Sequence, residues 1–195
     1  MAIEIKNLSI RYSEKKIFDG FNLTIEDNEQ IALLGVSGIG KTSLINAIMG
    51  LIPFDGTINI PVNTIIAAVF QENRLFEWLT VYDNIKMTCN KALQNDISEY
   101  ILRAGLNLKD VVYSLSGGMK RRTAILRALL APHNLLILDE PFKGLDNATR
   151  LSVMDLIKEK ASQSTMILIT HDAWEADYFN CRQIVLPSGY ALQPE

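Results

Sequence analysis

Apolar and polar residues alternate along the first part of the chain. In residues 3–10 and 21–25 the apolar side chains fall mainly on every second position, which predicts two strands with one buried face each. We expect turns at Asp19-Gly20 and at residues 27–29, because Asp, Asn and Gly favour turn conformations. Residues 30–34 are almost wholly apolar, which is typical of a strand buried on both faces.

The following segment continues with one helix and two strands. Residues 43–49 favour a helix, and Gly50 is suited to end it. Asp55-Gly56 is expected to join two further strands, at 57–60 and 64–70. The first third of the chain therefore predicts antiparallel strands around one buried parallel strand.

Helices dominate from Thr80 onwards. Thr80 and Asp83 have the spacing of an N-terminal cap, and Pro132 is expected to stop the last helix of the segment. The predicted helices cover residues 80–90, 96–104 and 118–130. We interpret residues 73–115 as a compact helical insert.

The last third alternates strands with helices. The predicted strands cover 134–139, 165–170 and 183–186, and the predicted helices 147–161 and 172–179. Buried apolar strands that alternate with helices indicate the α/β class, with a parallel sheet covered on both faces. We expect one domain over residues 1–195, in which 1–72 and 116–195 form the core around the insert.

Composition and charge exclude several classes of protein. Apolar residues make up 48% of the 195 residues and the net charge is −3, so a sizeable core is expected and nucleic acid is not an expected partner. The cluster Lys120-Arg121-Arg122 favours a solvated helix face over a nucleic-acid patch. Cys89 and Cys181 lack metal-type spacing and suit a reducing compartment. No apolar run approaches the ~20 residues that cross a bilayer.

The chemistry centres on one loop, Gly35–Thr42, which fits the pattern G-x-x-x-x-G-K-[ST] between an apolar strand and a helix. Glycines let the backbone curl around phosphates, Lys41 is placed to neutralise them, and the Thr42 hydroxyl is placed to bind magnesium. The alternative is an ordinary glycine-rich turn. The predicted nucleotide-binding residues of this segment are Gly35, Val36, Ser37, Gly38, Ile39, Gly40, Lys41, Thr42 and Ser43.

Two carboxylates follow the apolar strand 134–139. Asp139 is placed to reach the magnesium shell beside Thr42, and Glu140 to polarise a water for attack on the γ-phosphate. The alternative is a helix-capping acid pair after a core strand.

Two further side chains follow predicted parallel strands. His171 comes after strand 165–170, where a γ-phosphate sensor would lie, although a lone histidine is more often structural. Gln71 comes after strand 64–70, where its amide is suited to join a metal shell. Taken alone it would be an ordinary loop residue.

Residues 115–119, Leu-Ser-Gly-Gly-Met, form a second anion-binding helix start. One ATP does not need two such sites from a single chain. We therefore expect this one to serve the ATP of a second subunit.

These elements, in this order, resemble the ATP-binding subunit of ABC transporters over essentially the whole chain. Gly35–Thr42 resembles the Walker A motif of that family, and Leu135–Glu140 its Walker B motif with the catalytic glutamate. Leu115–Met119 resembles the signature motif, Gln71 the Q-loop and His171 the H-loop.

Two more positions agree with the family. Gly144-Leu145-Asp146 resembles the D-loop, and Tyr12 stands where the family places an aromatic ring that stacks on adenine. The alternative for Tyr12 is a strand aromatic in the core. Residues 70–81 and 117–122 resemble the corresponding segments of importers of the nitrate, sulfonate and taurine type. Met119 replaces the more usual glutamine, and Lys143 stands where glycine is common.

The resemblance implies a P-loop NTPase of the ABC ATPase fold, with a mixed β-sheet core, an antiparallel β subdomain and a small helical subdomain. It implies ATP and Mg²⁺ as cofactors, with Thr42, Gln71 and Asp139 around the metal. The catalytic residues that it implies are Glu140, His171 and Gln71.

The resemblance also implies partners. Two copies, or one copy and a second ATP-binding subunit, would close head to tail on ATP, with Ser116, Gly117, Gly118 and Asp146 contributed in trans. Permease subunits and, indirectly, an extracytoplasmic substrate-binding protein would complete an importer, which places the chain at the cytoplasmic face of the membrane. Phe76 and Trp78 would suit docking of a membrane subunit, with burial against the insert as the alternative.

Two other functions compete with this interpretation. An ABC ATPase of DNA repair, chromosome organisation or translation would carry a long coiled-coil insert or two tandem cassettes. A P-loop kinase for a small molecule would have no use for residues 115–119 or His171.

Overall fold

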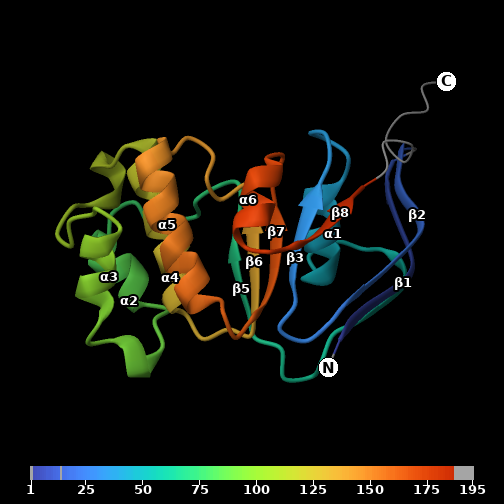
Figure 1. The fold of residues 1–195 in the computed structure, drawn as a ribbon, viewed down its shortest axis with the longest axis horizontal. Helices are drawn as coiled ribbons and strands as arrows, with labels where there is room; N and C mark the ends of the chain where they lie inside the picture. Colours follow the sequence, from blue (N-terminus) through green and yellow to red (C-terminus); the bar gives the residue numbers. More distant parts are fainter. Residues whose placement is uncertain (1, 14, 187–195) are drawn as a thin grey trace.

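The structure is a computed structural model that describes residues 2–13 and 15–186. A parallel sheet lies in the middle of the molecule, with helices at one end and an antiparallel sheet at the other (Figure 1). The strands are β1 (Ile3–Tyr12), β2 (Lys15–Ile25), β3 (Gln30–Leu34), β4 (Asp55–Asn59), β5 (Ile66–Val69), β6 (Leu135–Asp139), β7 (Thr165–Ile169) and β8 (Arg182–Val185). The α-helices are α1 (Lys41–Ile48), α2 (Val81–Lys86), α3 (Ile97–Arg103), α4 (Gly117–Leu130), α5 (Asn147–Lys160) and α6 (Ala173–Tyr178), with 3₁₀ turns at Lys91–Leu93 and Val112–Ser114.

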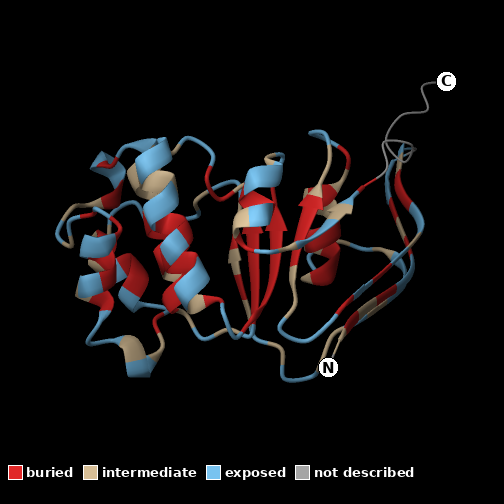
Figure 2. Ribbon diagram, viewed as in Figure 1, coloured by how far each residue is buried: buried red, intermediate tan, exposed pale blue. Residues whose placement is uncertain are grey.

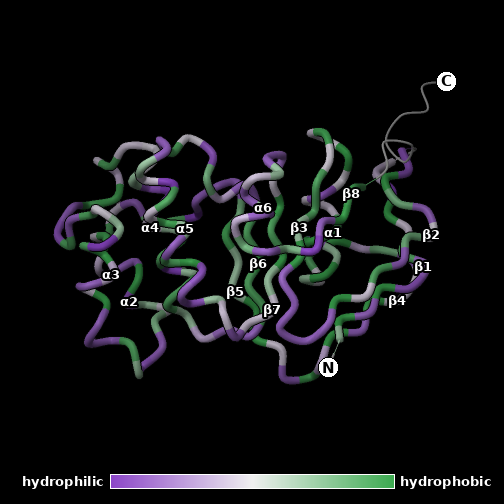
Figure 3. The backbone as a smooth tube through the Cα atoms, in the orientation of Figure 1, coloured by the Kyte–Doolittle hydropathy of each residue, from purple (hydrophilic) through white to green (hydrophobic). Residues whose placement is uncertain are grey.

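The parallel sheet has five strands in the order β5-β6-β7-β3-β8. Its central strands, β6, β7 and β3, are buried almost throughout and are mainly hydrophobic along their length (Figures 2 and 3). Successive residues of β6 point to opposite faces of the sheet. Leu135 and Ile137 pack with α1 and the antiparallel sheet. Leu136 and Leu138 pack with α4 and α5 on the other face. The predicted parallel sheet with two covered faces is confirmed.

The antiparallel sheet has three strands in the order β2-β1-β4, and it corrects two predicted turns. Asp19-Gly20 lies inside β2, because bulges between β1 and β2 absorb the irregularity and let the strand continue. Asp55-Gly56 begins β4. A Cβ on Gly56 would lie 2.4 Å from the carbonyl oxygen of Asn7, so this glycine permits close approach of two strands.

The first helix at the helical end of the molecule, α2, begins at the capping residue that the sequence predicts. The Thr80 hydroxyl accepts a hydrogen bond of 3.1 Å from the backbone N–H of Asp83, as predicted, and α2 is shorter than expected, ending at Lys86. Helices α2 and α3 share one apolar cluster with α4 and α5. We propose that residues 73–115 act as an insert that packs against α4 and α5.

Within the described residues the longest helices, α4 and α5, have 14 residues each. No helix there combines the length and apolarity that a bilayer span requires.

Candidate functional site

The loop between β3 and α1 is shaped by glycines. Gly35, Gly38 and Gly40 have φ values of 149°, 80° and 109°, a region that side chains disfavour. Gly40 is also limited by space, since a Cβ there would lie 2.4 Å from Ile17 Cγ2. The loop therefore needs glycine both for its own conformation and for its packing against β2.

Helix α1 begins without a side-chain cap. Its N-cap is Gly40, whereas Ser116 and Asp146 cap α4 and α5 through their own side chains. The first-turn N–H groups of α1 and the positive end of its dipole thus remain available to an anion.

A hollow of about 140 Å³ opens over this helix start. It is lined by Ser37, Gly38, Gly40, Lys41, Thr42 and Ser43 of the loop and α1, together with Ile17, Gln71 and Glu140. Of the predicted loop residues, Gly35, Val36 and Ile39 are not part of that lining. The Ile39 side chain packs in the core instead.

Lys41 is a buried cation at the floor of the loop. Its Nζ donates to the carbonyl oxygens of Gly35 at 2.6 Å and of Val36 at 3.0 Å. Burial lowers the pKa of Lys41, and the nearby charges of Glu140 and Asp139 oppose that effect. An ammonium held this way is suited to neutralise a polyphosphate.

Asp139 is 1% exposed and faces the same loop. Thr42 Oγ1 donates to Asp139 Oδ2 at 2.9 Å, and Asp139 Oδ1 is buried without a hydrogen-bond partner among the described residues. Burial raises the pKa of Asp139, and the side chains of Thr42 and Gln71 oppose the rise. A hydroxyl oxygen beside an unpartnered carboxylate oxygen is the hard oxygen donor set that Mg²⁺ prefers, so these residues fit that metal.

Glu140 follows directly on the strand end. Its φ is 46°, a value uncommon outside glycine, and its N–H donates to the carbonyl of Ile169 at 2.9 Å. This bond to the neighbouring strand holds the residue at the carboxyl edge of the sheet. Its side chain lines the hollow above the P-loop, where a base for a water molecule is needed.

Arg121 corrects the expectation that Lys120-Arg121-Arg122 is a solvated face. Arg121 is 5% exposed, and burial lowers the pKa of its guanidinium while the charges of Asp139 and Glu140 oppose that effect. It donates to the carbonyl oxygens of Phe70, Gln71, Asp139, Glu140 and Pro141. One side chain on α4 therefore joins the chain after β5 to the chain after β6.

A sequence signal for Arg121 was available. Apolar Ala124, Ile125 and Ala128 follow it at the spacing of one helix face, and all four residues are buried. Its two neighbours are engaged elsewhere: Lys120 pairs with Glu77 at 2.8 Å, and Arg122 donates to the carbonyls that end α3.

The start of α4 opens into a second hollow, of about 310 Å³. Gly117 and Gly118 line it, and Gly118 lies beside Gly144 of the predicted D-loop. Gln71 and Glu140 line both hollows. The two helix starts that are predicted to bind anions are thus near each other, but they do not share one hollow.

The remaining predicted residues lie around this edge. His171 is exposed two residues after β7, in a segment braced by hydrogen bonds from Thr170 to Glu175 at 2.5 Å and from Asp172 N–H to Thr170 at 3.0 Å. Tyr12 ends β1 and is 47% exposed, so it is not the core aromatic of the alternative interpretation. Neither residue lines the hollow above the P-loop.

Comparisons with known proteins give matches over most of the chain. The model of the family described as ABC transporter matches residues 18–143. The chain is 35% identical over 200 residues to the aliphatic sulfonates import ATP-binding protein SsuB 2 of Rhizobium johnstonii, covering 98% of this chain and 80% of the relative. It is 35% identical to SsuB 3 of Paraburkholderia xenovorans, with 100% and 82% covered, and 38% identical to SsuB 1 of Pseudomonas fluorescens, with 96% and 74% covered.

Proposed function

This chain belongs to the ABC transporter family, and we propose that two copies of it close head to tail around two ATP molecules and thereby drive an importer of a small solute. As a member of the family the chain binds ATP and is an ATPase coupled to transport. One observation carries the proposal: the uncapped start of α1 and the glycine-rich start of α4 open into separate hollows of the same chain. A second chain is the natural way to bring both helix starts to one triphosphate.

Within each site the residues have separate tasks. The N–H groups of the P-loop and Lys41 bind the phosphates, and Thr42 and Asp139, with Gln71, would hold Mg²⁺. When bound, the ion supplies positive charge that offsets the negative charge of the phosphate oxygens. Glu140 takes the proton of the attacking water.

Four further contributions complete the proposal. His171 contacts the γ-phosphate from the end of β7, and Tyr12 stacks on adenine with its exposed ring. The partner copy supplies its signature segment, and the D-loop aspartate approaches from the same side. The residues proposed to act in trans are Ser116, Gly117, Gly118 and Asp146.

An import role is supported by the printed names of the relatives, which are import ATP-binding proteins. The membrane-bound partners would then be permease subunits, with a substrate-binding protein on the far side of the membrane. The chain would be held at the cytoplasmic face through the permease. Trp78 is 73% exposed and lies edge-on to Phe76, with ring centroids 5.5 Å apart, which suits docking of a partner helix.

The proposal is tested by dimer formation. Glu140→Gln is expected to retain ATP binding, to slow hydrolysis by at least about a hundred-fold, and to elute as a dimer with MgATP but as a monomer with MgADP. Adding Ser116→Arg should abolish the dimer while single chains still bind ATP. Ser162→Arg, at an exposed serine just after α5, is the matched control and should leave the dimer intact.

Two outcomes would contradict the proposal. A Glu140→Gln chain that hydrolyses ATP at the wild-type rate would refute the role of that base. A dimer that persists with Ser116→Arg, or an ATP-loaded chain that stays monomeric, would refute the shared site.

A further inference from the structure

Lys143 forms an ion pair with Glu140. Its Nζ lies 3.2 Å from Glu140 Oε2, and the backbone N–H of Lys143 donates to the carbonyl oxygen of Glu140 at 3.3 Å. Both contacts arise in the turn that leads from β6 to α5. The proximity of the two side chains is therefore built into the backbone of the turn.

Three cations interact with the charge of Glu140, and they differ in their other contacts. Lys41 is engaged by the carbonyls of its own loop, and Arg121 by carbonyls at the strand ends. Within residues 2–13 and 15–186, the Lys143 ammonium has Glu140 as its one hydrogen-bond partner, and its side chain is 75% exposed. Lys143 is thus the cation that can leave without breaking another contact.

The position of Lys143 relative to the two hollows determines the side from which it contacts the Glu140 carboxylate. Glu140 lines the hollow above the P-loop and also the second hollow beside Gly117 and Gly118. Lys143 lines only the second one. Glu140 thus lies where the two hollows meet, and the ion pair holds one of its carboxylate oxygens towards Lys143, a residue of the second hollow.

We propose that Lys143 is a positioning residue that restrains Glu140 in the separate chain and so keeps ATP hydrolysis slow until the carboxylate is released. This inference rests on the proposed role of Glu140 as the base. A cation at this distance occupies one of the two acceptor oxygens of the Glu140 carboxylate and holds that carboxylate in place. Because an ion pair with an exposed lysine is weak, closure of a second copy is enough to break it.

The test is steady-state ATP hydrolysis by the full chain, measured by phosphate release. Lys143→Met is expected to raise kcat by roughly two- to five-fold with KM for ATP unchanged, the range that a weak ion pair allows. Lys143→Arg restores the cation and should return kcat to the wild-type value. The ratio of Lys143→Met to wild type should fall towards one as salt is raised, because salt screens an exposed pair.

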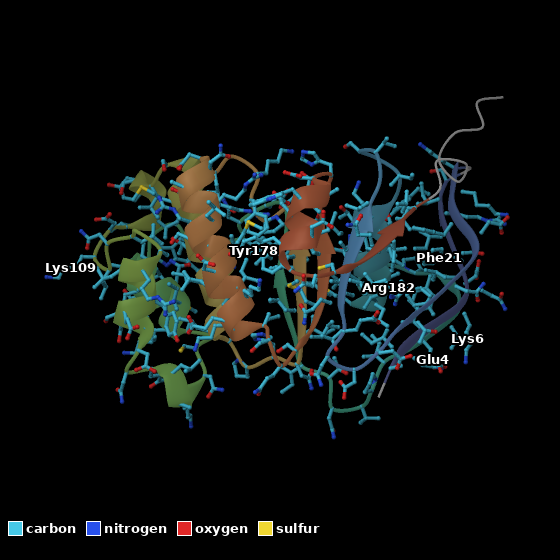
Figure 4. The ribbon with its side chains drawn as sticks, in the orientation of Figure 1. Glu4, Lys6, Phe21, Lys109, Tyr178 and Arg182 are labelled. Atoms are coloured by element: carbon cyan, nitrogen blue, oxygen red, sulfur yellow. The ribbon has the colours of Figure 1, made fainter. Side chains whose placement is uncertain are left out.

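A matched control separates this effect from general loss of charge. Lys109 is an exposed lysine at the helical end of the molecule, far from the sheet edge (Figure 4). Lys109→Met should leave both kcat and KM unchanged. Thermal melting of each variant should match the wild type, because both lysines are exposed.

The outcomes distinguish failure of this inference from failure of the proposed function. If Glu140→Gln is inactive while Lys143→Met has a wild-type or lower kcat, or Lys143→Arg is as fast as Lys143→Met, the restraint is refuted and the base is not. If Glu140→Gln is as active as the wild type, the base and the restraint are both refuted. In the Glu140→Gln background, Lys143→Met should add no activity.

Discussion

The hydroxyl of Thr42 donates a hydrogen bond of 2.9 Å to Oδ2 of Asp139, a residue 97 positions away in the chain. Thr42 lies in the first turn of α1, and Asp139 is the last residue of β6. The bond ties the phosphate loop to the carboxyl edge of the sheet. It also leaves Oδ1 of Asp139 buried and without a hydrogen-bond partner among the described residues.

Removing the Thr42 hydroxyl should therefore weaken both stability and metal-dependent binding. Thr42→Val keeps the shape of the side chain but deprives a buried carboxylate of its donor, a loss of about 1–3 kcal/mol. Thr42→Ser keeps the hydroxyl and should stay near wild type. Thermal melting without nucleotide, and titration of ATP with and without Mg²⁺, would check this. A Thr42→Val chain that melts like wild type would show that the hydroxyl is not needed.

Loss of the Lys41 ammonium should strongly weaken nucleotide binding. Hydrogen bonds to charged groups contribute about 1.5–3 kcal/mol, so Lys41→Ala is expected to reduce ATP affinity by at least about ten-fold. Lys109→Ala, at an exposed lysine remote from the loop, should leave affinity unchanged. Fluorescence titration with a labelled ATP is a suitable measurement. Wild-type affinity in Lys41→Ala would contradict the role of this lysine.

Asp139→Asn should stabilise the nucleotide-free chain at neutral pH. Burial raises the pKa of Asp139, so its ionised form destabilises the folded state, fully above the folded pKa and progressively less as pH falls through it. We expect Asp139→Asn to melt about 2–4 °C above wild type at pH 7, roughly 1 kcal/mol. The difference should shrink as pH is lowered into the acidic range.

The control for this prediction is Asp55→Asn, at an exposed carboxylate of β4. It should melt like wild type at pH 7. A melting temperature of Asp139→Asn below that of wild type at pH 7 would show that the carboxylate stabilises the empty site.

Arg121 should matter for stability far more than the adjacent Lys120. Arg121→Met removes donors from several carbonyls at the two strand ends, and we expect a loss of about 3 kcal/mol or more. Arg121→Lys keeps the charge with fewer donors and should fall in between. Lys120→Met removes only an ion pair with exposed Glu77 and should change stability by less than about 1 kcal/mol. Denaturant unfolding would measure all three, and equal losses for Arg121→Met and Lys120→Met would contradict the structural difference.

Trp78 should affect assembly with the permease and not ATP hydrolysis in the absence of the permease. Trp78→Ala is expected to leave basal ATP hydrolysis unchanged and to reduce co-purification with a permease by at least about ten-fold, as large aromatic anchors at interfaces do. Val62→Ala, at a fully exposed apolar residue between β4 and β5, is the control. Undiminished co-purification of Trp78→Ala would place the docking surface elsewhere.

Much of this fold follows from patterns formed by residues that are close together in the sequence. The apolar runs of β3, β6 and β7 need two covered faces, and the caps at Thr80 and Ser116 lie within three residues of the N–H groups that they accept from. The glycines of the P-loop likewise follow from the backbone that they must adopt. Period, capping and glycine spacing depend on neighbours in sequence, so the sequence by itself determined the α/β class, the family resemblance and the candidate site residues, whose roles stay predictions.

Tertiary structure decided what depends on distant neighbours. Gly56 was expected to form a turn, but it lies within a strand because its backbone passes close to Asn7. Arg121 was expected in solvent, but carbonyls from two separate strand ends surround it. Lys143 had no assigned role until the turn after β6 brought it to Glu140. A residue's burial and partners follow from segments far apart in the chain, and only their packing brings those segments together.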